Sequence, residues 1–130
     1  MFLSNFRFTE VLTTCEIRDF LVNTLGMTPS EKAAICSLNQ LIEGLCYYTL
    51  LFQRHIFSYF AACSSSLIIA LEIKGFDEKA NFLRSEIKSR IPEQIGQINA
   101  ARDFMLAKGP ELTNCPIFLQ KFAELQAKPT

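Results

Sequence analysis

The sequence predicts an all-α protein, folded as an antiparallel helical bundle of four or five helices with a long central helix. Apolar residues recur about every 3.6 positions through the long segments of the 130-residue chain, which is the period of a helix with one buried face. No segment alternates apolar and polar residues as a half-buried strand does. A chain of this length has the usual size of one domain, so residues 1–130 are expected to form a single helical-bundle domain.

The first expected helix covers residues 6–25 and ends at Gly26. Its apolar residues are spaced i, i+3, i+4 and i+7, so they fall on one face of a helix. They are Phe8, Val11, Leu12 and Cys15. This segment is therefore expected to be amphipathic, with one face turned to the core.

The clearest helix start in the chain is Thr28-Pro29-Ser30-Glu31. The Thr28 hydroxyl can accept a backbone N–H, Pro29 stands where no N–H is needed, and Glu31 can reach back as in a capping box. From here an apolar heptad series stays in phase up to Gly75. The series is Ile35, Leu38, Ile42, Leu45, Thr49, Phe52, Ile56, Tyr59, Cys63, Ser66, Ala70 and Ile73.

Two interpretations of residues 28–74 stay open. One continuous helix would be about 70 Å long, whereas a compact domain of this size is about 35–40 Å across. A broken helix is expected to turn first at Gln53-Arg54-His55, the polar triplet in an apolar belt, and second at Ser64-Ser65-Ser66. Because residues 35–73 are apolar on every side, either form must be buried by protein or by lipid.

In the second half of the chain, glycine and proline residues mark where helices are expected to end or bend. Gly75 is expected to end the central segment in a left-handed turn, and Asp77 to cap the following helix. That helix should cover residues 78–108 and be kinked at Pro92, which removes one backbone hydrogen bond. Residues 74–90 carry five positive charges, interpreted as an exposed helix face in which Glu86 pairs with Arg90, with a patch for an acidic partner as the alternative.

A last short helix is expected after Gly109-Pro110, with Pro116 as its first residue. Its apolar residues recur on one side, so this helix should also pack against the bundle. They are Phe118, Phe122 and Leu125.

The charge and hydropathy of the chain limit which kinds of partner and which location are expected. The 13 Lys and Arg residues balance the 13 Asp and Glu residues, so no net field attracts nucleic acid, and no nucleic-acid partner is expected. The N-terminal residues lack the features of a secretory signal, so a cytoplasmic location is expected. The best candidate for a membrane span, residues 56–71, contains four serines and is shorter than the roughly 20 residues required, so a membrane-spanning helix is not expected.

Chemistry-bearing residues are sparse. The five cysteines are an odd set without Cys-x-x-Cys spacing and are interpreted as reduced core thiols. The single histidine, His55, has no cysteine within a helical turn. The glycines form neither a phosphate-binding loop nor a dinucleotide motif. The sequence therefore predicts no catalytic, cofactor-binding or metal site, and a protein that is not an enzyme.

The function favoured by these patterns is a non-catalytic protein-interaction module, an adaptor, chaperone-like or regulatory subunit that presents apolar helical surface. Twelve phenylalanines without tryptophan also allow an alternative, a binder of a small-molecule or lipid-like ligand. Such a ligand would occupy a Phe-rich pocket within the bundle, with His55 and Tyr59 at its mouth.

The protein partner expected first is a second copy of the chain. The other helices offer too little surface to cover a long helix that is apolar all round, so a two-fold homodimer is predicted through Phe52, Ile56 and Tyr59. This expectation depends on the continuous helix. If the chain turns back at residues 53–55, the two halves cover each other and the need for a partner falls.

Overall fold

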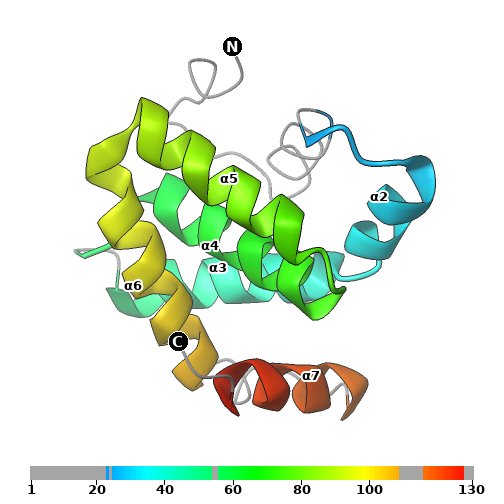
Figure 1. The fold of residues 1–130 in the computed structure, drawn as a ribbon. Helices are drawn as coiled ribbons and strands as arrows, with labels where there is room; N and C mark the ends of the chain where they lie inside the picture. The colour runs from blue at the N-terminus through cyan, green and yellow to red at the C-terminus, as the bar shows by residue number, and fades with distance from the viewer. Residues whose placement is uncertain (1–22, 24, 54–55, 109–115, 128–130) are drawn as a thin grey trace.

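The computed structural model confirms an all-α bundle of packed helices (Figure 1). It describes residues 23, 25–53, 56–108 and 116–127, without the side chains of residues 39–40, 50–53, 116–118 and 126. Within these ranges every regular element is a helix. The elements are α2 (Pro29–Cys36), α3 (Asn39–Gln53), α4 (Tyr59–Ile73), α5 (Asp77–Arg90), α6 (Pro92–Lys108) and α7 (Pro116–Ala127). The helix expected over residues 6–25 lies almost entirely outside the described residues.

The long central helix is not formed, and residues 28–74 divide into α2, α3 and α4. The chain turns at Ser37, whose hydroxyl donates to the Ala34 carbonyl at 2.6 Å, and again between Gln53 and Tyr59. The second turn adjoins the polar triplet expected as the first choice for a break. Folding back lets α3 and α4 bury each other's apolar faces, which one extended helix cannot do.

The second break considered, at Ser64-Ser65-Ser66, does not occur, because these serines lie inside α4. Serine disfavours a helix interior when its hydroxyl competes for backbone groups. Here the hydroxyls of Ser65 and Ser66 donate to the carbonyls of Ala61 and Cys63, at 2.6 and 2.8 Å, on the helix itself. Their polarity is thus accommodated without unwinding α4.

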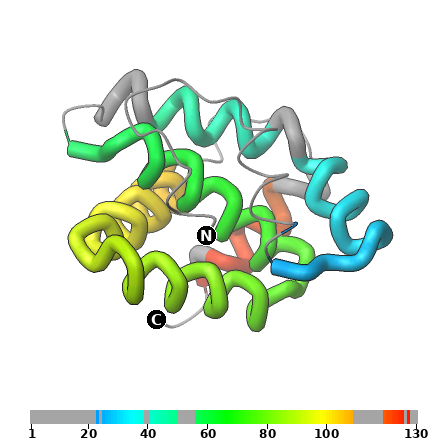
Figure 2. Tube along the Cα trace, turned by 90° about the horizontal axis from the view of Figure 1, so that it is seen from above, coloured from blue at the N-terminus to red at the C-terminus, as the bar shows by residue number. Residues whose placement is uncertain are grey.

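The central element is α4, which packs against α3, α5, α6 and α7. Figure 2 shows α4 between α3 on one side and α5 on the other, and all residues from Phe60 to Leu71 are buried. The expectation that residues 35–73 must be covered on every side is confirmed for Phe60–Leu71 of α4, where the cover is protein. It is wrong for α3 and the turn after it, where Tyr47 and Ile56 are exposed. None of the described helices is long and apolar enough to cross a membrane.

Three local signals place the ends of helices. The Thr28 capping box is present, with Thr28 N–H donating to Glu31 at 2.9 Å and Glu31 N–H donating to the Thr28 hydroxyl at 3.2 Å. Gly75 has φ +82° and ends α4 in the predicted left-handed turn. Pro116 is the first residue of α7, which buries Phe122 and Leu125.

Two predicted boundaries were wrong. Phe76, without a side-chain cap, precedes α5, and Asp77 is instead its first residue, where a negative charge favours the positive end of the helix dipole. The helix expected to kink at Pro92 is divided into α5 and α6, because Ile91 adopts φ −137° and ψ 66°. A proline disfavours helical geometry in the residue before it, and Pro92 is well placed to begin a new helix.

Candidate functional site

The three residues predicted to form an interaction surface do not lie on one helix, as the prediction had assumed. Ile56, in the turn between α3 and α4, is 60% exposed. Tyr59, the first residue of α4, is half-buried and packs against the core. Phe52 lies in α3, and its side chain is outside the described residues. Of the two described side chains, only Ile56 is presented to solvent.

Tyr47 is a large exposed residue that the sequence analysis did not single out, and it is 69% exposed. It lies on the outer face of α3, because the inner face buries Ile42, Leu45, Cys46 and Thr49. Tyr47 and Ile56, called the hairpin surface here, thus both belong to the α3–α4 hairpin. Phe82 is 47% exposed and belongs to α5, which lies on the opposite side of α4 from α3 (Figure 2).

The turn that carries Ile56 is anchored to α6. Ser58 caps α4 by accepting the Ala61 N–H at 3.0 Å, and its own N–H and hydroxyl donate to Gln97 and Gln94 at 2.8 and 2.9 Å. Next to it, Phe57 is buried and lies 6.2 Å from Phe104 between ring centroids. Ile56 is therefore exposed on a turn held in place by polar and aromatic contacts.

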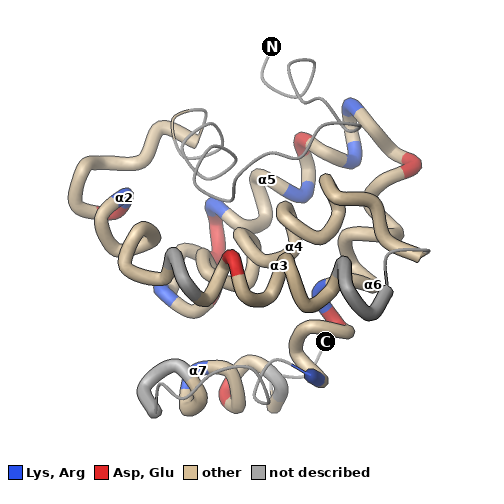
Figure 3. Tube along the Cα trace, turned by 180° about the vertical axis from the view of Figure 1, so that it is seen from behind, with Lys and Arg blue, Asp and Glu red and all other residues tan. Residues whose placement is uncertain are grey.

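The basic residues of positions 74–90 do not form a uniform free patch. Lys79 donates to the Leu25 carbonyl at 2.9 Å, and Arg84 lies 3.4 Å from Glu72. The predicted pair of Glu86 and Arg90 is confirmed at 2.8 Å. Figure 3 shows acidic and basic residues interspersed along α5, and Arg84 and Arg90 of this stretch each lie against a glutamate.

A part-buried ion pair between α4 and α6 was missed in the sequence analysis. Glu72 is held by Arg102, with Nε to Oε1 at 2.8 Å and Nη2 to Oε2 at 3.0 Å. The two side chains are 13% and 15% exposed. Thirty residues separate them in the sequence, so no local spacing could have signalled the pair. Its geometry is that of a structural clamp between helices.

Cys46 and Cys63 meet at the interface of α3 and α4, with 2.6 Å between the sulfur atoms. Both are free thiols and 3% and 1% exposed, so these two cysteines lie in the core, as predicted. The hydrogen bond with Cys46 and then burial raise the pKa of the Cys63 thiol, while a hydrogen bond with Tyr59 opposes them. On a continuous helix residues 46 and 63 would be far apart, so the contact exists only because α4 folds back onto α3.

Two buried hydroxyls, those of Thr49 and Ser64, find no hydrogen-bond partner among the described residues. They come from α3 and α4 and are not joined to a nucleophile or a base by any contact described. Three or more potential metal ligands do not gather anywhere in the described ranges. His55, on which most nucleophilic chemistry would depend, lies outside the described residues.

A small hollow lies where the end of α4 meets α7, with a volume of about 210 Å³. Its lining is Glu72, Ile73, Gly75, Lys121, Glu124 and Leu125. Ligand pockets commonly have about 300–1,000 Å³ and mostly apolar walls. This hollow therefore differs in size and lining from the Phe-rich pocket of the alternative function.

Comparison with known proteins found no relative of this chain. No protein-family model, no curated protein and no solved structure matches the chain. Function is therefore inferred from the side chains alone.

Proposed function

We propose that this chain is a non-catalytic protein-interaction module that works through apolar side chains presented by its α3–α4 hairpin. The observation that carries the proposal is the exposure of Tyr47 and Ile56, at 69% and 60%, beside α4, which is buried from Phe60 to Leu71. Tyrosine is enriched among the residues that dominate binding energy at protein interfaces. A partner that covers both side chains would remove substantial apolar area from water.

The structural use of the buried polar groups also supports a binding role. Glu72 and Arg102 join α4 to α6, and Ser65 donates to the Ile98 carbonyl of α6 at 2.8 Å. A catalytic site needs polar groups that converge on a cleft and remain available to a substrate. The groups named here are engaged between helices, which favours a scaffold for a surface over a site of turnover.

The homodimer remains a prediction with a changed basis. Its original reason was a long helix too apolar to be covered by one chain, and the fold-back of α3 onto α4 removes that reason. Tyr47 and Ile56 are two exposed apolar side chains and not a long uncovered helix face, so we propose another protein as the principal partner. Light scattering coupled to size exclusion tests the second copy separately: a mass of one chain at micromolar concentration would exclude it.

The proposal is tested by placing a photo-crosslinking benzoylphenylalanine at Tyr47 in the full chain within the cell that makes it. Phe82 is the matched control, because it is also a large exposed ring but lies on α5. We expect a defined crosslinked protein from position 47 and none, or a different one, from position 82. Identical products from both positions, or none from position 47, would overturn the proposal.

Variants then measure how much the hairpin surface contributes. We expect Tyr47→Ser with Ile56→Ser to weaken binding of the crosslinked protein about tenfold or more, because residues at the centre of an interface each cost more than about 1 kcal/mol when truncated. Phe82→Ser should leave the affinity unchanged. Circular dichroism of each variant checks that the helical fold is retained.

A further inference from the structure

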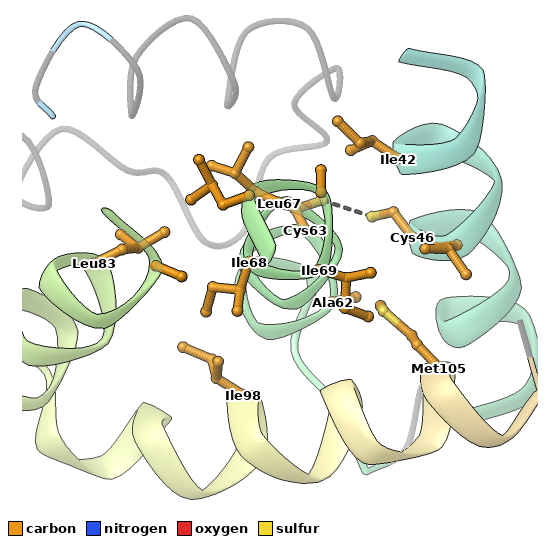
Figure 4. Close-up of a cluster of buried hydrophobic side chains, with 14 of the residues drawn as sticks. Ile42, Cys46, Ala62, Cys63, Leu67, Ile68, Ile69, Leu83, Ile98 and Met105 are labelled. Atoms are coloured by element: carbon orange, nitrogen blue, oxygen red, sulfur yellow. Dashed lines mark hydrogen bonds between the residues drawn. The ribbon is translucent and has the colours of Figure 1, made fainter. Parts of the chain in front are cut away.

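We propose that Cys46 and Cys63 are a redox site, a buried dithiol that is oxidised to a disulfide joining α3 to α4. Their sulfur atoms are 2.6 Å apart, and Figure 4 shows the two side chains pointing toward each other across the interface. A disulfide bond is about 2.05 Å long. The pair therefore needs a closure of only about 0.6 Å, within the reach of small side-chain rotations.

The two helices hold this approach in place on both sides. Ile42, one turn before Cys46, and Leu67, one turn after Cys63, are each 1% exposed and lie in the same core. Figure 4 shows these side chains around the sulfur pair. Because packed cores change shape little, the thiols are held together by the fold and not by a chance rotamer. Cys36, the remaining described cysteine, lies on α2 and is only half-buried.

The oxidant we name is a low-molecular-weight disulfide. The thiolate of one cysteine attacks it, forms a mixed disulfide and releases one small thiolate. The second cysteine then attacks the protein sulfur of that mixed disulfide, forming the bond between Cys46 and Cys63 and releasing the second small thiolate. The two cysteines lose two protons and two electrons in total. The small disulfide gains both and leaves as two thiols.

Burial decides when this reaction can occur. The thiolate is the attacking species, and the hydrogen bond with Cys46, followed by burial, raises the pKa of Cys63. An outside reagent must also reach thiols that are 3% and 1% exposed. The disulfide is therefore expected to form while the hairpin folds or opens, and to resist reduction once the core has closed over it.

The bond would stabilise the fold by restricting the unfolded chain. It links residues seventeen positions apart, a loop for which the chain-entropy model gives a sizeable effect. For a domain of this size we expect the thermal midpoint to rise by about 10 °C on oxidation. Such a bond would also tie together the two helices of the hairpin, independently of whether the hairpin surface binds a partner.

The test uses the full chain with Cys15, Cys36 and Cys115 replaced by serine. The variant is refolded from urea with a mixture of oxidised and reduced glutathione, free thiols are alkylated, and the protein is digested with trypsin. Cleavage after Lys32, Arg54 and Lys74 leaves Cys46 in peptide 33–54 and Cys63 in peptide 55–74. We expect these peptides to be joined in most molecules and the intact protein to be lighter by two hydrogens.

A second measurement tests the role of burial. The folded, reduced variant is exposed to the same glutathione mixture without urea, and we expect oxidation to be about tenfold slower or more. Equal rates would contradict the buried dithiol. Both thiols remaining open to alkylation after refolding would overturn the disulfide itself, as would a mixed disulfide with glutathione as the final product.

Matched variants separate the bond from its side chains. Cys36→Ser in the otherwise unchanged chain should retain the link between the two peptides, whereas Cys46→Ala should abolish it and the rise in thermal midpoint together. Circular dichroism confirms that each variant is helical. If Cys46→Ala fails to fold, Cys63→Ala gives the same comparison from the other helix.

Discussion

Glu72 of α4 accepts two hydrogen bonds from Arg102 of α6, at 2.8 and 3.0 Å, across two side chains that are 13% and 15% exposed. The two parallel bonds match the planar guanidinium to the carboxylate. Arg84 of α5 approaches the same carboxylate at 3.4 Å. Three helices, α4, α5 and α6, are thus tied together at one acidic residue.

Arg102→Met should destabilise the protein by about 2–3 kcal/mol, because it leaves a largely buried carboxylate with only the longer contact to Arg84. Arg90→Met is the control, since its pair with Glu86 joins more exposed side chains within one helix and should contribute about 0.5 kcal/mol or less. Urea unfolding measures both. Equal losses in the two variants would show that the Glu72 pair is not special.

The capping box at the start of α2 predicts a pH dependence. The backbone hydrogen bond from Thr28 is the main cause that lowers the pKa of Glu31 from 4.5. A lowered pKa means that the ionised carboxylate favours the folded state. Its contribution is complete above pH 4.5 and is lost as the pH falls through the lower folded-state pKa.

Thermal unfolding from neutral pH down to about pH 3 checks this contribution in Glu31→Gln. The variant should be less stable than the unchanged chain at neutral pH and approach it in acid. A constant difference across the range would contradict the assigned cause. Thr28→Ala should cost about 1 kcal/mol at neutral pH, because it removes the cap for the Glu31 N–H.

Two glycines should respond in opposite directions to alanine. Gly75 has φ +82°, so Gly75→Ala should cost about 1–2 kcal/mol through backbone strain. Gly96 lies inside α6, where an added Cβ would meet nothing within 4 Å, so Gly96→Ala should stabilise by about 0.5–1 kcal/mol. Urea unfolding decides the signs, and a loss at Gly96 would indicate that its exposed face is covered.

Ser64 and Ser65 are equally buried but differ in their partners. The Ser65 hydroxyl donates to the carbonyls of Ala61 and Ile98, so Ser65→Ala should cost about 1–2 kcal/mol. The Ser64 hydroxyl has no partner among the described residues, so Ser64→Ala should be neutral or stabilising by roughly 1 kcal/mol. If Ser64→Ala destabilises as much as Ser65→Ala, the hydroxyl has a partner after all.

The apolar spacing of residues 28–74 predicted helices but did not by itself predict where the chain turns between them. The heptad phase from Ile35 to Ile73 is compatible with one helix or with a hairpin, because two stacked helices also bury residues at that spacing. The polar triplet at residues 53–55 pointed to the turn, and Gln53 is indeed the last residue of α3. The three serines looked like an equally polar interruption, but the hydroxyls of Ser65 and Ser66 donate to carbonyls within α4.

The candidate surface was predicted only in part for the same reason. Ile56 was singled out and is exposed, but Tyr47 was missed, because the outer face of α3 cannot be known until the inner face has a partner. Phe52 was predicted beside them, and its side chain lies outside the described residues. Which apolar residue faces solvent depends on where the hairpin folds, and the sequence left that open.

The sequence by itself was enough to predict three local features: the capping box at Thr28, the left-handed turn at Gly75 and the helix start at Pro116. Each of them depends on a few adjacent residues and on backbone sterics. The need to bury α4 on every side could also be inferred, since it follows from composition alone. The contacts of Cys46 with Cys63 and of Glu72 with Arg102 came from the packing of helices, because residues 17 and 30 positions apart meet only after loop closure has brought their helices together.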